Sequence, residues 1–141
     1  MVEYTLVERL PTVAEYQRLR QAVGWHGVDI SAAEKGLSNS LFSVCLINNG
    51  EIIGCGRVVG DGGVYLYIQD IIVIPPFQGR GIGKIIMERV MTFIESHASW
   101  GTVIGLMAAE NVSGFYQKFG FIERPANKPG MFQIFNFGTY T

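Results

Sequence analysis

The chain has 141 residues, of which 48% are apolar and 16% are charged, a composition typical of a folded domain and not of a disordered chain. Its formal net charge of -1 excludes the strongly basic surface of a general nucleic-acid binder or of a protein held on an anionic membrane. No apolar run approaches the roughly 18 residues of a membrane span, and residues 1–10 lack the pattern of a secretion signal, so we expect a cytoplasmic protein.

The first predicted elements are one strand and two helices. Residues 2–8 form a short strand, and apolar residues at helical spacing predict a helix over residues 11–24. Ser31 and Glu34 have the spacing of a capping box, which predicts a second, short helix that ends near Gly36.

Three strands in succession come next. Residues 41–47 and 51–59 are apolar and flank Asn48-Asn49-Gly50, a turn sequence that tolerates positive φ and predicts a hairpin. A second turn at Asp61-Gly62-Gly63 leads into residues 64–74, which are apolar along their whole length. That continuous pattern predicts a central strand covered on both faces.

The second half of the chain alternates helices and strands. Apolar residues recur at helical spacing over residues 80–97, and a strand is predicted over residues 102–108. Asn111 is placed to cap a further helix that ends at Gly120, and residues 130–137 predict a last strand. The order is that of a mixed α/β fold, and we expect a single domain over residues 1–141.

The cysteines and histidines suggest no metal site. Cys45 and Cys55 lie in apolar segments with no Cys or His at metal-ligand spacing, so buried free thiols are expected rather than a disulfide. His26 and His97 have no acid or nucleophile near them in the sequence, and we expect both at the surface.

The most informative segment is Gln78-Gly79-Arg80-Gly81-Ile82-Gly83-Lys84, between a predicted strand and a predicted helix. A helix start has N–H groups without partners and partial positive charge, and glycines let the backbone approach a pyrophosphate closely. A Walker loop is excluded because Ile85 follows Lys84, so no hydroxyl is present to hold magnesium. A dinucleotide fingerprint is excluded because the glycines alternate and the next strand ends without an acidic residue.

The pattern Gln/Arg-x-x-Gly-x-Gly/Ala at such a junction resembles the coenzyme A site of the GCN5-related N-acetyltransferase (GNAT) family. Residues 67–75 also resemble that family's fourth strand, and residues 114–121 resemble its C-terminal motif. The resemblance, to a small bacterial single-domain member, implies a mostly antiparallel mixed sheet of six to seven strands. About four helices flank this sheet, which is splayed between strands four and five. It also implies an enzyme that moves the acetyl group of acetyl-coenzyme A to a primary amine without a metal.

The resemblance further implies which residues bind the coenzyme. In the family, the pantetheine arm enters between the splayed strands and pairs with open backbone groups, here those of Ile71 and Val73. Ala109 stands where many relatives have an Asn that bonds the pantetheine, and nearby Asn111 either takes that role or only caps its helix. The full implied set is Ile71, Ile72, Val73, Gln78, Gly79, Arg80, Gly81, Ile82, Gly83, Lys84 and Asn111.

The catalytic groups also follow from the resemblance. Backbone N–H groups near Ile72 and Val73 would polarise the thioester carbonyl, and Tyr116 would protonate the departing thiolate. The other interpretation of Tyr116 is a core aromatic. Several relatives carry a Glu base where this chain has Gln69, so the base would be a water chain, or the amine would arrive neutral. Asp70 is expected to face away from Gln69, with a structural hydrogen-bonding role.

The acceptor site is expected to include Trp25, Tyr67 and Gln69, although Trp25 could equally cover the core. The resemblance favours a small primary amine, such as an arylalkylamine, over a protein lysine. Arg57 is interpreted as an ordinary strand-edge charge. The alternative function is a catalytically silent acetyl-coenzyme A sensor or an interaction domain. No nucleic acid or membrane partner is expected, and a homodimer is left open.

Overall fold

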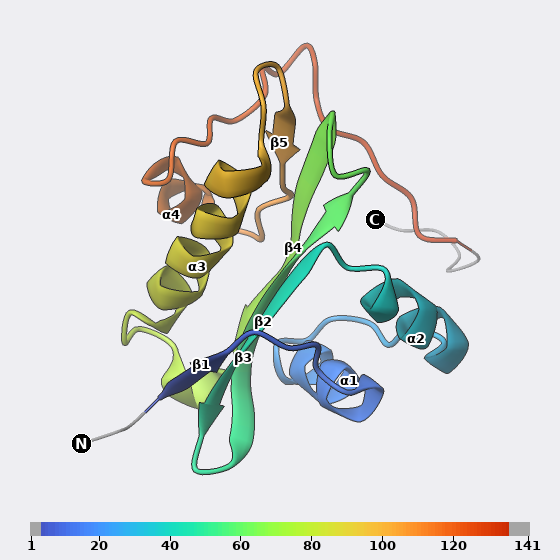
Figure 1. Cartoon of the computed structure of the whole chain (residues 1–141), viewed down its shortest axis with the longest axis vertical. Coiled ribbons are helices and arrows are strands. Elements are labelled where there is room, and N and C mark those ends of the chain that lie inside the picture. Colours follow the sequence, from blue (N-terminus) through green and yellow to red (C-terminus); the bar gives the residue numbers. More distant parts are fainter. Residues whose placement is uncertain (1–3, 136–141) are drawn as a thin grey trace. The chain divides into compact units, whose positions relative to one another are not determined.

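Residues 4–135 are described by a computed structural model, in which the chain forms two units, Met1–Leu106 and Met107–Thr141. The first unit contains a five-stranded sheet with the strand order β1-β2-β3-β4-β5 (Figure 1). The strands are β1 (Thr5–Val7), β2 (Phe42–Asn48), β3 (Glu51–Gly60), β4 (Tyr65–Val73) and β5 (Val103–Gly105). The helices of this unit are α1 (Val13–Ala22), α2 (Ile30–Ser38), the 3₁₀ turn η1 (Pro75–Phe77) and α3 (Ile82–His97).

The sheet is mixed and mostly antiparallel, as predicted. Strands β1 to β4 pair antiparallel, and β5 pairs parallel with β4. Helices α1 and α2 lie on one face and α3 lies on the other (Figure 1). Helix α3 comes close to β3 at Gly56, where an added Cβ would be 2.7 Å from Ile86 of the helix. The predicted fold class is therefore confirmed, with five strands among residues 4–135 in place of six or seven.

The start of α2 differs from the prediction. Its N-cap is Asp29, whose carboxylate accepts a hydrogen bond from the Ala32 N–H at 3.0 Å. Ser31 lies one residue inside the helix, so the predicted Ser31–Glu34 capping box is wrong. Asp and Ser are both good N-caps, and the sequence alone does not say whether Asp29 or Ser31 takes the N-cap position.

This assignment predicts unequal effects for two substitutions to alanine. Asp29→Ala removes a cap and is expected to lower the free energy of unfolding by about 1 kcal/mol. Ser31→Ala is expected to change it by no more than a few tenths of a kcal/mol, because Ala is the better helix former. Urea denaturation of both variants measures the difference. A larger loss for Ser31→Ala than for Asp29→Ala would contradict the assignment.

The hairpin and the long apolar strand have the predicted positions. Asn49 and Gly50 both have positive φ in the β2–β3 turn, as a two-residue hairpin requires. In β4, buried residues alternate with half-buried ones. Ile72 packs with Leu19 of α1, and Ile71 lies beside Gly56 on the face of α3, so the predicted cover on both faces is confirmed. β5 pairs with only three residues of β4 and leaves the C-terminal part of that strand, including Ile71 and Val73, beside an unpaired edge.

Three predictions for the second half of the chain need correction. Strand β5 covers only Val103–Gly105 of the predicted 102–108. Helix α4 (Ser113–Gln117), in the second unit, has Val112 at its N-cap, and Asn111 lies before it with a φ of 63°. Asn tolerates this left-handed conformation, and Asn111 does not cap the helix. Residues 130–135 form no strand, and the rest of that predicted strand lies outside the described residues.

The cysteine prediction is confirmed. Cys45 and Cys55 are buried free thiols on adjacent strands, and burial raises the pKa of Cys45 to about 11. Among residues 4–135 there is no helix long and apolar enough to cross a bilayer, and no cluster of three or more metal-binding side chains. The expected cytoplasmic location stays a prediction.

Candidate active site

The glycine-rich segment forms the N-terminus of α3. Gly79 and Gly81 have φ values of 77° and 80°, a left-handed conformation that costs glycine nothing and other residues much more. Gly81 is the N-cap and makes no side-chain capping bond, so the first N–H groups of the helix are available to an anion. Ile82 is 1% exposed and fixes this helix end in the core.

The side chains around this loop are cationic and solvent-exposed. The Arg80 guanidinium lies 5.5 Å from the centre of the Phe77 ring, and Lys84 forms an exposed pair with Glu88 at 3.8 Å. These cations add to the partial positive charge of the helix start. The loop can therefore bind a phosphate group through backbone N–H groups, with basic side chains beside it.

Gln78 connects the loop to β4. Its side-chain Nε2 donates a hydrogen bond to the Val73 carbonyl at 2.8 Å. The α3 N-terminus and the C-terminal end of β4 are thereby held next to each other. Gln78 was predicted to contact the coenzyme, and in this structure its amide nitrogen is used for this internal contact.

Among residues 4–135, no strand pairs with the C-terminal part of β4 on the side of β5, so its backbone edge there is open. Pairing with β5 extends from Tyr65–Val103 to Tyr67–Gly105 and goes no further. The Ile74 N–H donates to the Ile53 carbonyl on the β3 side at 3.0 Å. Because backbone direction alternates along a strand, the N–H and C=O groups of Ile71 and Val73 point the other way, toward the unpaired edge.

A β-bulge at Asp70 lies just before this open edge. The β3–β4 register changes from Arg57–Gln69 to Cys55–Ile72, which leaves one extra residue on β4. Asp70 lies in the bulge with a φ of 56°. Residues opposite each other in a sheet share a face, so Gln69 lies on the face of Arg57, which Asp70 also contacts. The expectation that Asp70 and Gln69 face opposite sides is wrong, because the bulge interrupts the alternation.

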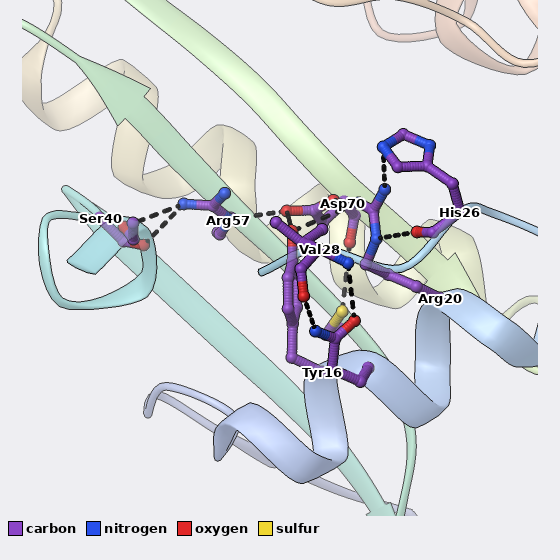
Figure 2. Close-up of polar contacts among 10 residues, drawn as sticks. Tyr16, Arg20, His26, Val28, Ser40, Arg57 and Asp70 are labelled. Carbon is purple, nitrogen blue, oxygen red and sulfur yellow. Dashed lines mark hydrogen bonds and ion pairs between the residues drawn. The ribbon is translucent and has the colours of Figure 1, made fainter. Parts of the chain in front are cut away.

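Asp70 is the centre of a buried polar network, which confirms its predicted structural role (Figure 2). Its Oδ2 accepts hydrogen bonds from Arg57 Nε at 2.6 Å and from the Tyr16 hydroxyl at 3.0 Å. Its Oδ1 lies 3.4 Å from Arg20 Nη1. Burial, followed by the charge of Asp70, raises the pKa of Tyr16, so this phenol is a protonated donor.

Arg57 belongs to this network and is not the predicted strand-edge charge. It lies on β3, an interior strand of the sheet, and its Nη1 also bonds the Ser40 hydroxyl at 3.1 Å (Figure 2). Burial opposes its charge, but the hydrogen bond and charge of Asp70 outweigh burial, and the pKa of Arg57 is raised. Tyr16 and Arg20 were missed by sequence reasoning, although their i, i+4 spacing places them on one helix face.

The predicted acceptor residues lie on the face of the network or near it. The Trp25 ring packs against the core around Leu19 and lies 5.4 Å from the Arg20 guanidinium, which supports the core-covering interpretation. The Tyr67 ring lies against Gly105 at the last pair of β4 and β5. His97 is exposed, as predicted, and His26 is half-buried; the His26 carbonyl accepts a hydrogen bond from Arg20 Nε.

Tyr116 lies in the second unit, on α4. Its ring packs edge-to-face on Phe115, with the ring centres 5.1 Å apart. Burial raises its pKa above the usual value near 10. The phenol therefore keeps its proton at neutral pH, as a general acid must.

Comparison with known proteins finds acetyltransferases by sequence and by structure. A family model described as the acetyltransferase (GNAT) domain matches residues 38–123. The N-acetyltransferase ycf52 of Pyropia yezoensis is 31% identical over 122 residues, which are 84% of this chain and 69% of that protein. The histone acetyltransferase TAP1 of Glycine max is 30% identical over 131 residues, 85% of this chain and 56% of that protein. A solved structure of a probable acetyltransferase from meticillin-resistant Staphylococcus aureus superposes with a TM-score of 0.90. It shares 35% identity, with 94% of this chain and 100% of that chain covered.

Proposed function

The chain belongs to the GNAT family of N-acetyltransferases, and from this premise we propose that it transfers the acetyl group of acetyl-coenzyme A to a small primary amine. The amine attacks the acetyl group directly, and Tyr116 is the general acid. One observation carries the proposal: Gln78 holds the uncapped start of α3 against the open edge of β4. A pyrophosphate site and a pantetheine-pairing edge then adjoin within the first unit.

The residues at these two places fit acetyl-coenzyme A. The pyrophosphate would accept hydrogen bonds from the N–H groups of Gly81, Ile82, Gly83 and Lys84 at the helix start. Arg80 and Lys84 would add positive charge beside it. The amide groups of a pantetheine arm would extend the sheet by pairing with the backbone of Ile71 and with the Val73 N–H, as an added strand does; the Val73 carbonyl already accepts from Gln78.

The chemical step requires groups that stabilise changing charge. The amine nitrogen forms a bond to the thioester carbonyl carbon while the carbon–sulfur bond breaks. Of the backbone N–H groups near Ile72 and Val73, that of Val73 points to the open edge and would stabilise the negative charge that develops on the carbonyl oxygen, whereas that of Ile72 points toward β3. Tyr116 would give its proton to the departing thiolate, and the amine would lose its excess proton to solvent.

Deprotonation of the amine is assigned to water and not to a side chain. Gln69 stands where several relatives carry a Glu base, and an amide cannot accept a proton usefully. Asp70 follows Gln69 in the chain, but both of its carboxylate oxygens already accept hydrogen bonds from Tyr16, Arg20 and Arg57. An amine that arrives neutral, or that loses its proton through ordered water, meets this requirement.

The acceptor class is tested with a panel of amines. Release of free thiol from acetyl-coenzyme A is measured with arylalkylamines, polyamines, amino sugars, amino acids and lysine peptides. The lysine peptides are essential because the soybean relative is named a histone acetyltransferase. We expect release that depends on a small amine and matches the N-acetyl product in amount. Release with lysine peptides alone would overturn the small-molecule assignment.

The same measurement separates the enzyme from the alternative function. A sensor or interaction domain would bind acetyl-coenzyme A but release no thiol with any amine. Absence of binding would instead overturn the proposed coenzyme site. The two failures are distinguished by calorimetry of acetyl-coenzyme A binding without an acceptor.

A further inference from the structure

Asp70, the residue in the β4 bulge, has an unusual backbone conformation. Asp70 adopts a φ of 56° in the middle of a strand, a conformation that L-residues take with strain and that Asp tolerates better than most. Such strain persists only where surrounding contacts fix it, and it is concentrated at functional sites. The contacts of Asp70 therefore need an explanation beyond strand pairing.

Those contacts come from two elements, α1 and β3, on either side of Asp70 in the network (Figure 2). Tyr16 and Arg20 reach the carboxylate from α1, and Arg57 reaches it from β3. Arg57 continues to the Ser40 hydroxyl after α2. On the backbone side, the Cys55 thiol donates to the Asp70 carbonyl at 3.2 Å. With its side chain 4% exposed, Asp70 is fixed at both its side chain and its main chain.

The network determines the orientation of the residues that follow it. Without the extra residue, the register of Ile71, Ile72 and Val73 would shift by one position. A one-residue shift exchanges the two faces of a strand and reverses the direction of its backbone groups. The edge groups of Ile71 and Val73 would then point toward β3, and the open edge would present the backbone groups of Ile72 instead.

We infer that Asp70, Arg57 and Arg20 are positioning residues for acetyl transfer: their buried ion-pair network holds the β4 bulge, and the bulge aims the backbone N–H groups of Ile71 and Val73 at the open edge where the thioester carbonyl is proposed to bind. This inference rests on the proposed function. It assigns no chemical step to Asp70, which acts through the main chain that follows it.

The test is a vibrational measurement on bound acetyl-coenzyme A labelled with ¹³C at the acetyl carbonyl. Hydrogen bonds from the oxyanion donors polarise this carbonyl and lower its stretching frequency. We expect the wild-type protein to shift the band to lower frequency. In Asp70→Asn, which removes the charge, and in Asp70→Gly, which keeps the positive φ, most of that shift is expected to be lost. If both variants bind the coenzyme with the wild-type band position, the inference is wrong.

Controls separate positioning from general stability. Arg89→Gln breaks the exposed pair with Glu8 at 3.0 Å, and Ile94→Val loosens the core of α3. Both are expected to keep the wild-type band. If the Asp70 variants do not fold, Arg57→Lys gives the same readout, since it keeps the charge and loses the forked geometry. Wild-type protein that fails to bind acetyl-coenzyme A would refute the proposed function itself, which is a different outcome.

Discussion

Gly81→Glu is expected to weaken acetyl-coenzyme A binding on the order of 100-fold or more, which corresponds to about 2.7 kcal/mol. Gly81 is the N-cap of α3 with a φ of 80°, a conformation that glutamate adopts with strain. The new carboxylate would also lie where the pyrophosphate is proposed to bind and would repel it. Calorimetric titration with acetyl-coenzyme A measures the loss.

Gly101→Glu is the matched control for this variant. Gly101 has a φ of 86° and no atom within 4 Å of an added Cβ. A glutamate at this position therefore brings the same backbone strain and the same negative charge as a glutamate at position 81. It lies beyond the other end of α3, a helix of 16 residues and about 24 Å long. We expect Gly101→Glu to lower thermal stability similarly and to leave coenzyme affinity intact. Equal affinities for the two variants would show that the coenzyme site is elsewhere.

Tyr116→Phe is expected to lower kcat by about 100-fold or more, the usual contribution of a general acid, while the affinity for acetyl-coenzyme A stays the same. Only the proton donor is removed, and the aromatic ring that packs on Phe115 remains. Steady-state kinetics with the amine identified by the panel measures kcat, and calorimetry measures affinity. An unchanged kcat would assign Tyr116 to the core and not to the chemistry.

The pH dependence adds a second readout for Tyr116. Burial raises its pKa above about 10, so the acid form is complete at neutral pH and is lost only as the pH rises through that raised value. The ratio of wild-type to Tyr116→Phe kcat is therefore expected to stay constant between about pH 7 and pH 9. A ratio that rises with pH across this range would mean that the phenolate acts as a base.

The fold could be predicted largely because its signals are local. Asn49-Gly50 requires positive φ at a hairpin turn, and the helical spacing over residues 80–97 places α3 almost at its observed bounds. Strands at the end of the chain were overpredicted, because an apolar segment such as residues 130–135 does not reveal whether a partner strand is present. Strand pairing depends on distant residues, which a local pattern does not contain.

The candidate site could be predicted in part for the same reason. The glycine loop is one continuous segment, so its place at the start of a helix with free N–H groups followed from the residues alone, whereas the left-handed φ of Gly79 and Gly81 is a finding of the structure. The Asp70 network could not be predicted, since it joins Tyr16 and Arg20 to Asp70, which lies 54 and 50 positions away in the chain. Asp70 was placed on the wrong face because strand alternation does not anticipate a bulge.

The most direct test of the proposed coenzyme site is to locate bound acetyl-coenzyme A on the protein. In a titration of ¹⁵N-labelled protein, we expect the largest amide shifts at the loop of residues 78–84 and at Ile71, Ile72 and Val73 on β4. Gly101 and the β2–β3 turn should not respond. Large shifts confined to other segments, with residues 71–73 and 78–84 unchanged at saturation, would contradict the assignment of the coenzyme site.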